Sequence, residues 1–151
     1  MSGTLRAIAW GGTACGILDA AATSLQFGLK GIKPLRVWQG VASGALGVAA
    51  FRQGWMSGGF GLILHFIIAF AAAAIFVAAS YQVPLLVRAY LVSGPVYGIL
   101  VYLVMNAIVV PLSSKPKRPN STADVLIQLA IHILFVGLPI SLAASRFGFF
   151  E

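Results

Sequence analysis

Long apolar segments separated by short polar connectors run through this chain. Asp19 is the only charge between Arg6 and Lys30, and neither 53–87 nor 89–114 contains a charged residue apart from a neutral histidine. A helix needs about 20 apolar residues to cross roughly 30 Å of hydrocarbon. The pattern therefore predicts four transmembrane helices, at about residues 7–29, 57–80, 85–112 and 123–145.

The segment 34–51 is apolar enough to enter a membrane, but it is short and contains Arg36 and Gln39. With four spans, seven Lys and Arg residues follow spans one and three and three lie on the other side, whereas a fifth crossing would give five on each side. Cytoplasmic loops carry an excess of Lys and Arg, which favours four spans. We therefore expect 34–51 to form a short interfacial or re-entrant helix beginning at Pro34, with both termini on the non-cytoplasmic side. The seven are Lys30, Lys33, Arg36, Arg52, Lys115, Lys117 and Arg118, and the three are Arg6, Arg88 and Arg146.

Composition supports a membrane protein. The chain is 60% hydrophobic and 9% charged, whereas soluble domains have roughly 25% charged residues. Its net charge of +7 does not indicate nucleic-acid binding, because the basic residues are spread over connectors rather than gathered on one helix face. The sequence thus predicts an all-α, polytopic membrane helix bundle, with residues 1–151 forming a single membrane domain whose principal partner is the lipid bilayer.

Each predicted span contains a polar residue near its middle, namely Asp19, His65, Asn106 and His132. At a rise of 1.5 Å per residue, all four lie roughly 12 to 17 Å from the cytoplasmic edge. A carboxylate at the bilayer centre costs on the order of 3 kcal/mol, so Asp19 must be protonated, paired or bound to something. We therefore expect the four side chains to form a polar layer at a common depth.

Residues four apart lie on one ridge of a helix, and these ridges extend the polar layer. Gln128 shares a ridge with His132, and Tyr102 shares one with Asn106. Small residues on such ridges let helices approach closely. The candidate ion or ligand site is Asp19, His65, Asn106, His132, Gln128 and Tyr102, with Arg36, Gln39 and Tyr97 in support and Gly12, Gly16, Gly94 and Gly98 as helix-packing positions.

Pro95 and Pro139 fall in the outer halves of their predicted helices. Each frees a backbone carbonyl and permits a kink, which would open the outer half of the bundle or merely bend the helix around a core. Arg36 would reach Asp19 or a lipid phosphate, or else extend to the interface.

Three functions are compatible with this pattern. The first is binding or conduction of a proton, small cation or small polar solute through the polar layer. The second is an accessory or scaffold subunit of a larger membrane complex or a homo-oligomer, in which the polar residues only hold helices together. The third is haem or metal binding through His65 and His132, although no ligand-spacing motif supports it and we expect no cofactor. No phosphate loop, cysteine pair or nucleophile motif indicates an enzyme.

Four strings of sequence carry a family resemblance: 36–47 (RVWQGVASGALG), 64–66 (LHF), 103–113 (LVMNAIVVPLS) and 131–140 (IHILFVGLPI). With these strings the chain resembles a family of small bacterial inner-membrane proteins described as YagU-like, over nearly its full length. The resemblance implies a bacterial inner-membrane location. It also implies that Arg36, Gln39, His65, Asn106 and His132 belong to the family's pattern, but it brings no established activity.

Overall fold

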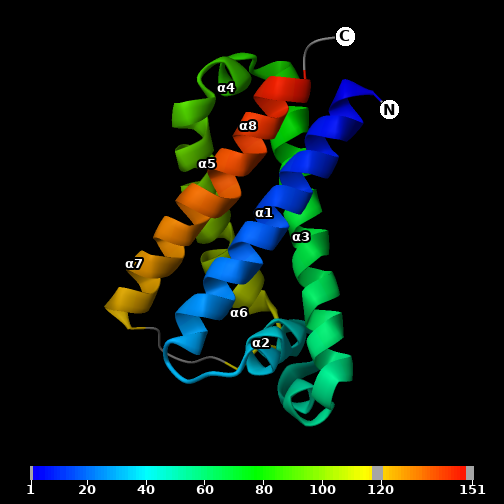
Figure 1. Ribbon diagram of the computed structural model, residues 1–151, viewed down its shortest axis with the longest axis vertical. Helices are drawn as coiled ribbons and strands as arrows, with labels where there is room; N and C mark the ends of the chain where they lie inside the picture. Colours follow the sequence, from blue (N-terminus) through cyan, green and yellow to red (C-terminus); the bar gives the residue numbers. More distant parts are fainter. Residues whose placement is uncertain (1, 117–120, 149–151) are drawn as a thin grey trace.

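The computed structural model describes residues 2–116 and 121–148, and this part of the chain is built from helices and connecting turns without strands. Figure 1 shows long helices running side by side, with both chain termini at one end of the bundle. In order, the elements are α1 (Gly3–Gly28), α2 (Pro34–Leu46), the 3₁₀ helix η1 (Gly47–Arg52), α3 (Gly54–Gln82), α4 (Leu85–Arg88), α5 (Tyr90–Val104), the π-helix η2 (Met105–Val109), α6 (Val110–Leu112), α7 (Thr122–Ile131), the π-helix η3 (His132–Gly137) and α8 (Leu138–Phe147).

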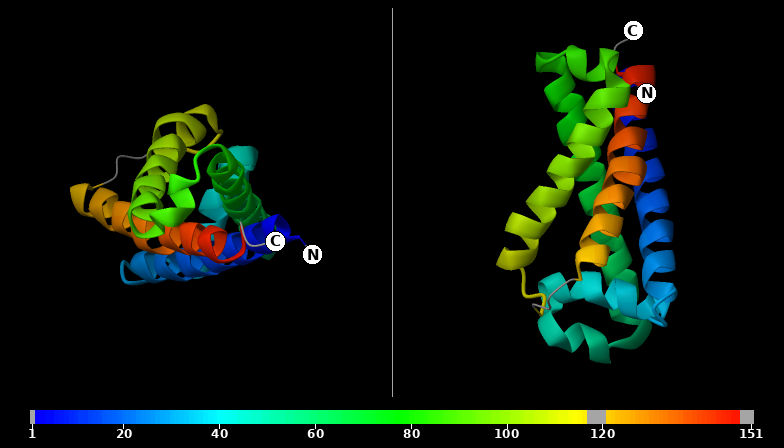
Figure 2. Two further views of the ribbon diagram at one scale, coloured as in Figure 1. Left: turned by 90° about the horizontal axis from the view of Figure 1, so that it is seen from above. Right: turned by 90° about the vertical axis from the view of Figure 1, so that its left-hand side faces the viewer.

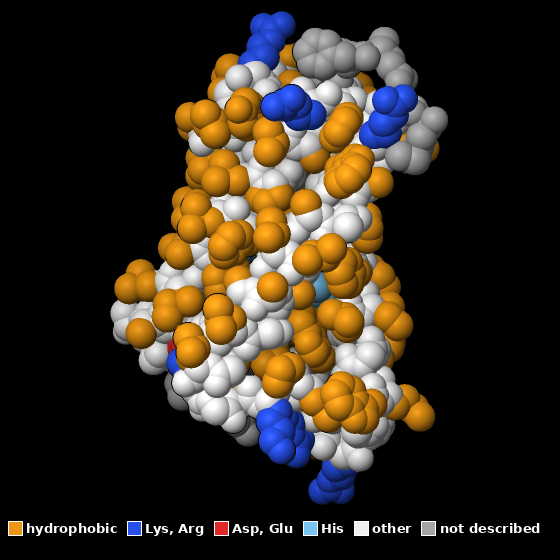
Figure 3. All heavy atoms as spheres, viewed as in Figure 1, with side chains coloured by type: hydrophobic (Ala, Val, Ile, Leu, Met, Phe, Trp, Pro, Cys, Tyr) orange, Lys and Arg blue, Asp and Glu red, His pale blue; other side chains and the backbone are white. Residues whose placement is uncertain are grey.

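In the described part of the chain, three helices are long and apolar enough to cross a membrane: Gly54–Gln82, Tyr90–Leu112 and Thr122–Phe147. The protein is therefore a helical bundle with the character of a multi-pass membrane protein. The remaining predicted span, at about residues 7–29, corresponds to α1, which has 26 residues but is interrupted by Arg6, Asp19 and Gln26 and by several glycines, so its composition is less apolar. In the space-filling view of Figure 3, hydrophobic side chains cover the length of the visible face and Lys and Arg side chains gather at its two ends.

Small side chains make up most of the core where α1, α3 and α8 meet. Ala7 and Cys15 of α1, Ala73 and Phe76 of α3 and Ile140 of α8 are all at most 1% exposed. Because alanine and glycine bring backbones close together, van der Waals packing can hold the helices without a water-driven hydrophobic effect. The described buried side chains leave no nitrogen or oxygen without a hydrogen-bond partner.

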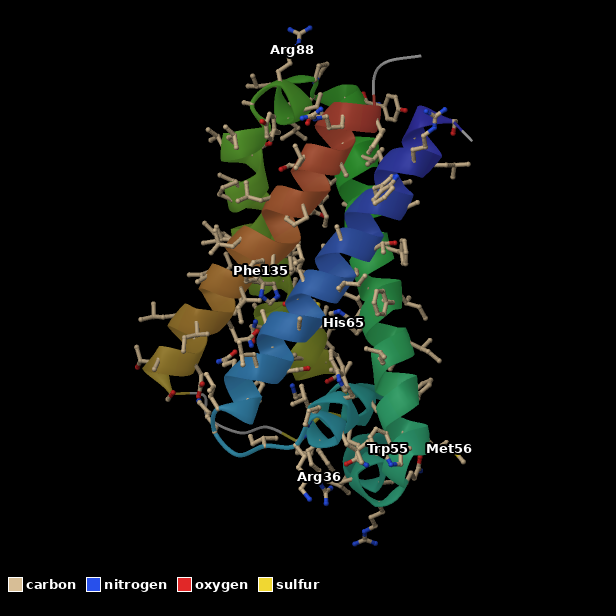
Figure 4. All side chains as sticks on the ribbon, viewed as in Figure 1. Arg36, Trp55, Met56, His65, Arg88 and Phe135 are labelled. Atoms are coloured by element: carbon tan, nitrogen blue, oxygen red, sulfur yellow. The ribbon has the colours of Figure 1, made fainter. Side chains whose placement is uncertain are left out.

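The helix expected to begin at Leu85 instead begins at Tyr90. Leu85–Arg88 forms a single separate turn, α4, and Ala89 then leaves helical geometry with φ −103° and ψ 40°. Pro84 precedes α4 and lacks a donor N–H, which interrupts the hydrogen-bond ladder after α3. The connection therefore forms a compact cap over the end of α3, with Arg88 at its tip (Figure 4).

The segment predicted as a short helix at 34–51 is divided between α2 and η1. Gly47 and Gly54 have φ of 58° and 56°, and this left-handed geometry, which favours glycine, turns the chain out of α2 and into α3. Figure 2 shows α2 lying across the end of the bundle opposite the termini. A Cβ at Gly61 would overlap the Trp38 carbonyl oxygen, so α2 contacts the backbone of α3 directly.

Candidate functional site

Asp19 and His65 face each other across the contact between α1 and α3. The His65 Nδ1 atom lies 3.7 Å from Asp19 Oδ2, and the two side chains are 14% and 15% exposed. Figure 4 places His65 between the two ends of the bundle, which are marked by Arg88 and Arg36. An acid and an imidazole are thus paired near the middle of the structure.

The tautomer of neutral His65 follows from its second contact. His65 Nε2 lies 2.9 Å from the Gly16 carbonyl oxygen. A carbonyl oxygen only accepts, so Nε2 carries the hydrogen and donates it, which leaves Nδ1 as the nitrogen that can take up a proton. That nitrogen is the one that faces Asp19, so the pair has one position for an exchangeable proton between two basic atoms.

Polar side chains continue from this pair along one face of α1. Thr23 Oγ1 donates to Asp19 Oδ1 at 3.5 Å, Gln26 follows at helical spacing, and Lys30 lies in the turn directly after α1. We call Asp19, Thr23, Gln26 and Lys30 the polar stripe. Since positions three and four apart share a helix face, the stripe leads from the middle of the bundle to the end where α2 lies.

The lower part of the polar stripe is bonded to α7. Gln26 donates from Nε2 to Asp124 Oδ1 at 3.2 Å and accepts at Oε1 from Gln128 Nε2, while Lys30 forms an ion pair with Asp124. Ser121 caps α7 by accepting from the Asp124 N–H at 3.1 Å. These contacts fasten α1 to α7 through polar groups, in contrast to the small apolar residues that join α1 to α3 and α8.

His132 belongs to a second group of side chains. Its Nδ1 donates to the Gln128 carbonyl oxygen at 2.8 Å, one turn earlier in its own helix, and its ring lies edge-on to Tyr102 with centroids 5.4 Å apart. Asn106 is exposed and donates to the Tyr102 carbonyl oxygen at 2.9 Å. The structure therefore brings Asp19 and His65 together and His132 and Tyr102 together, but the contacts of Asn106 stay within its own helix.

The helix that contains Asn106 and the helix that contains His132 each change to π geometry at that residue. Met105–Val109 contains Asn106 and lies just before Pro111, and His132–Gly137 begins at His132 and lies just before Pro139. π-helical turns are rare and often occur at functional sites. Pro95 lies inside α5, where the helix continues through it.

The supporting residues predicted from sequence have structural partners. Arg36 donates to the Gln39 side chain and, at 3.0 Å, to the Phe51 carbonyl oxygen, so it bonds within the α2–η1 corner and does not pair with Asp19. Gln39 is buried and donates to the Gly54 carbonyl oxygen at 3.0 Å. Tyr97 donates to the Ala72 carbonyl oxygen at 2.7 Å, which links α5 to α3.

Each predicted packing glycine lies at a close helix contact. A Cβ at Gly12 or Gly16 would overlap the ring of Phe70 or Phe66 of α3. On α5, a Cβ at Gly94 would meet Ser141, and one at Gly98 would overlap the His132 carbonyl oxygen. The glycines thus set how closely α3 approaches α1 and how closely α5 approaches the η3–α8 helix.

Gln26 is a site residue that sequence reasoning missed. It is 6% exposed and joins α1 to α7. The signal that could have found it is the spacing 19, 23, 26 and 30, since polar residues on one face of an otherwise apolar helix indicate a bonded face.

The described residues contain no group of three or more His, Cys, Asp or Glu side chains that could hold a metal ion. His65 and His132 each bond a separate carbonyl oxygen.

Comparison of the chain with protein-family models, with curated proteins and with solved structures gives no match in any of the three. Membership in the YagU-like family therefore stays a prediction.

Proposed function

We propose that this protein is a four-span membrane protein of the bacterial inner membrane that binds a proton at the Asp19–His65 pair and transfers it along the bundle. The observation that carries the proposal is the 3.7 Å separation of His65 Nδ1 and Asp19 Oδ2 in the middle of the helices. Imidazole titrates closer to neutral pH than any other side chain, so an imidazole beside a carboxylate is suited to taking up and releasing protons.

The fourth span in this proposal is α1. Its 26 residues extend about 39 Å at 1.5 Å per residue, which exceeds the roughly 30 Å of the hydrocarbon layer. It lies beside α3 and α8 along its length (Figures 1 and 2). A partner for Asp19 lowers the cost of placing its carboxyl group in the membrane, because a hydrogen-bonded or paired acid is not left unsolvated.

A proton is favoured over a metal ion by the contacts around the pair. His65 Nε2 donates to the Gly16 carbonyl oxygen, which leaves Nδ1 as the one imidazole nitrogen with a free lone pair, and Nδ1 faces the Asp19 carboxyl group. One nitrogen and one carboxyl group suit an exchanged proton better than a metal ion, which typically takes four or more ligands. The polar stripe offers access from the end where Lys30 lies. Positive-inside counting assigns that end to the cytoplasm, with seven Lys and Arg residues against three.

The test is proton uptake by proteoliposomes that contain a pH-sensitive dye and carry a potassium diffusion potential. We expect His65→Ala to lower the rate by about a hundredfold, the lower end of what a positioned proton-transfer group contributes. Asn106→Ala is the matched control, because Asn106 is exposed and bonds within its own helix, and it should leave the rate unchanged. Equal rates for His65→Ala and the unsubstituted protein would reject the proposal, provided that both keep the same helical circular dichroism.

A second function, an accessory subunit of a larger membrane complex, is supported by the exposure of α5. In the apolar stretch of Tyr90–Leu112, only 6% of the residues are buried, against 28% in each of the other two candidate spans. A photo-crosslinking amino acid at Val96, which is 59% exposed on α5, should then give one discrete protein adduct in native membranes. The same probe at Leu25 of α1, which is 65% exposed, is the control, and lipid adducts alone at both positions would reject a partner on α5.

A further inference from the structure

An open groove lies between α1 and α8, and neither Asp19 nor His65 lines it. Its volume is about 830 Å³, and Tyr90 and Leu91 at the beginning of α5 also line it. Trp10, Leu18, Pro139 and Phe147 are among its lining residues, and Arg146 is the charged one. The volume falls in the range of about 300 to 1,000 Å³ typical of sites for small molecules.

The position of Arg146 gives the groove two chemically different parts. Arg146 lies in the last turn of α8, is exposed, and has no ion-pair partner among the described residues. Trp10 and Phe147 stack beside it with centroids 6.5 Å apart. Aromatic rings at this level are typical of membrane interfaces, and the apolar lining continues from them towards Leu18 in the middle of α1.

We propose that this groove binds a phospholipid with a net negative headgroup, one acyl chain lying along the apolar lining and the phosphate pairing with Arg146. A ligand complementary to the groove must have a long apolar body and an anionic group at one end. An anionic phospholipid has this form, and an Arg side chain close to the membrane surface attracts an anionic headgroup. The inference depends on membrane insertion and is independent of proton transfer.

The groove can be tested through Trp10 itself. In a Trp38→Phe, Trp55→Phe background, Trp10 is the remaining tryptophan, and phospholipids with brominated acyl chains quench it on contact. We expect half-maximal quenching at about fivefold lower mole fraction for brominated phosphatidylglycerol than for brominated phosphatidylcholine, as one basic residue at a lipid surface would give. Arg146→Gln should abolish this preference, and Arg88→Gln, a change at the same end but outside the groove, should retain it.

A second pair of variants tests the groove's shape. Ala14→Phe places a ring in the groove, whereas Thr13→Phe adds the same ring at an exposed neighbour that is not part of the lining. Mass spectrometry of lipid retained by the detergent-purified protein, with the three tryptophans in place, should show loss of bound phosphatidylglycerol in Ala14→Phe only. Equal quenching by the two lipids, unchanged retention in Ala14→Phe, or a protein dimer that shields Trp10 in place of lipid would each overturn the proposal.

Discussion

The two halves of α1 meet their neighbours through different chemistry. From Gly3 to Gly16, α1 packs with glycine, alanine and cysteine against the phenylalanines of α3 and the small residues of α8. From Asp19 to the turn that holds Lys30, it presents the polar stripe to His65 and to α7. The first half is a close apolar contact that supplies rigidity, whereas the second half contacts its neighbours through hydrogen bonds and ion pairs.

The comparison implies that substitutions in the two halves affect different measurements. Changes to the close contacts should lower the stability of the bundle, because an added atom must displace backbone. Changes to the polar stripe and to His65 should lower proton transfer with a smaller loss of stability. Four substitutions test this difference in α1 and at the close and polar contacts of the other helices.

The largest effect on stability is expected for Gly137→Ala. A Cβ at Gly137 would overlap the Gly94 carbonyl oxygen, so η3 and α5 must separate. We expect a loss of about 3 kcal/mol, the upper range for overpacking in a core, measured as the free energy of unfolding in mixed micelles of detergent and SDS. Gly28→Ala, also in a helix but with nothing near its Cβ position, should be neutral or slightly stabilising, and equal losses in both variants would contradict close packing at Gly137.

Asp19→Asn should lower proton uptake without unfolding the protein. The amide keeps the size of the carboxyl group and can still accept from Thr23, but it cannot bind and release a proton. The expected loss of rate is about a hundredfold, with a change in unfolding free energy below about 1 kcal/mol. An Asp19→Asn variant that transports at the normal rate would show that His65 acts without the carboxyl group.

Gln26→Leu tests the polar contact between α1 and α7. Leucine removes both hydrogen bonds of Gln26 and leaves the Gln128 amide and one Asp124 oxygen with fewer partners. We expect a loss of about 1 to 3 kcal/mol in unfolding free energy, typical of an unsatisfied buried polar group. Gln53→Leu, at an exposed position before α3, is the control, and similar losses for both variants would argue against the bonded stripe.

The smallest effect is expected for Tyr97→Phe. The substitution removes the hydrogen bond to the Ala72 carbonyl oxygen but keeps the ring contact with Phe76, whose centroid lies 4.9 Å away. The loss should be about 1 kcal/mol, the typical net contribution of one hydrogen bond, with proton uptake unchanged. A marked loss of uptake in this variant would place Tyr97 in the transfer path. Residues that pack the helices would then not be separate from those that transfer protons.

Residues such as Asp19 and His65 could be chosen from the sequence because charged or titratable side chains in apolar helices stand out against their neighbours. Gly94 and Gly98 could be chosen in the same way, since small residues four apart indicate a packing ridge. Arg36 shows the limit of this reasoning. Its spacing permitted contact with Asp19, but the fold places α2 at the end of the bundle, where Arg36 bonds to Phe51 instead.

The helical class, the membrane character and the presence of polar groups in apolar helices follow from the sequence alone, because they depend on residue type and on spacing along a helix. Which polar groups meet was decided by the tertiary structure. Asp19 pairs with His65 because Gly16 lets α3 approach α1, while Asn106 remains exposed because η2 mainly contacts α5 and α6, the adjoining parts of its own helix. Depth can be counted along a helix, but rotation and lateral position depend on the contacts of every helix in the bundle.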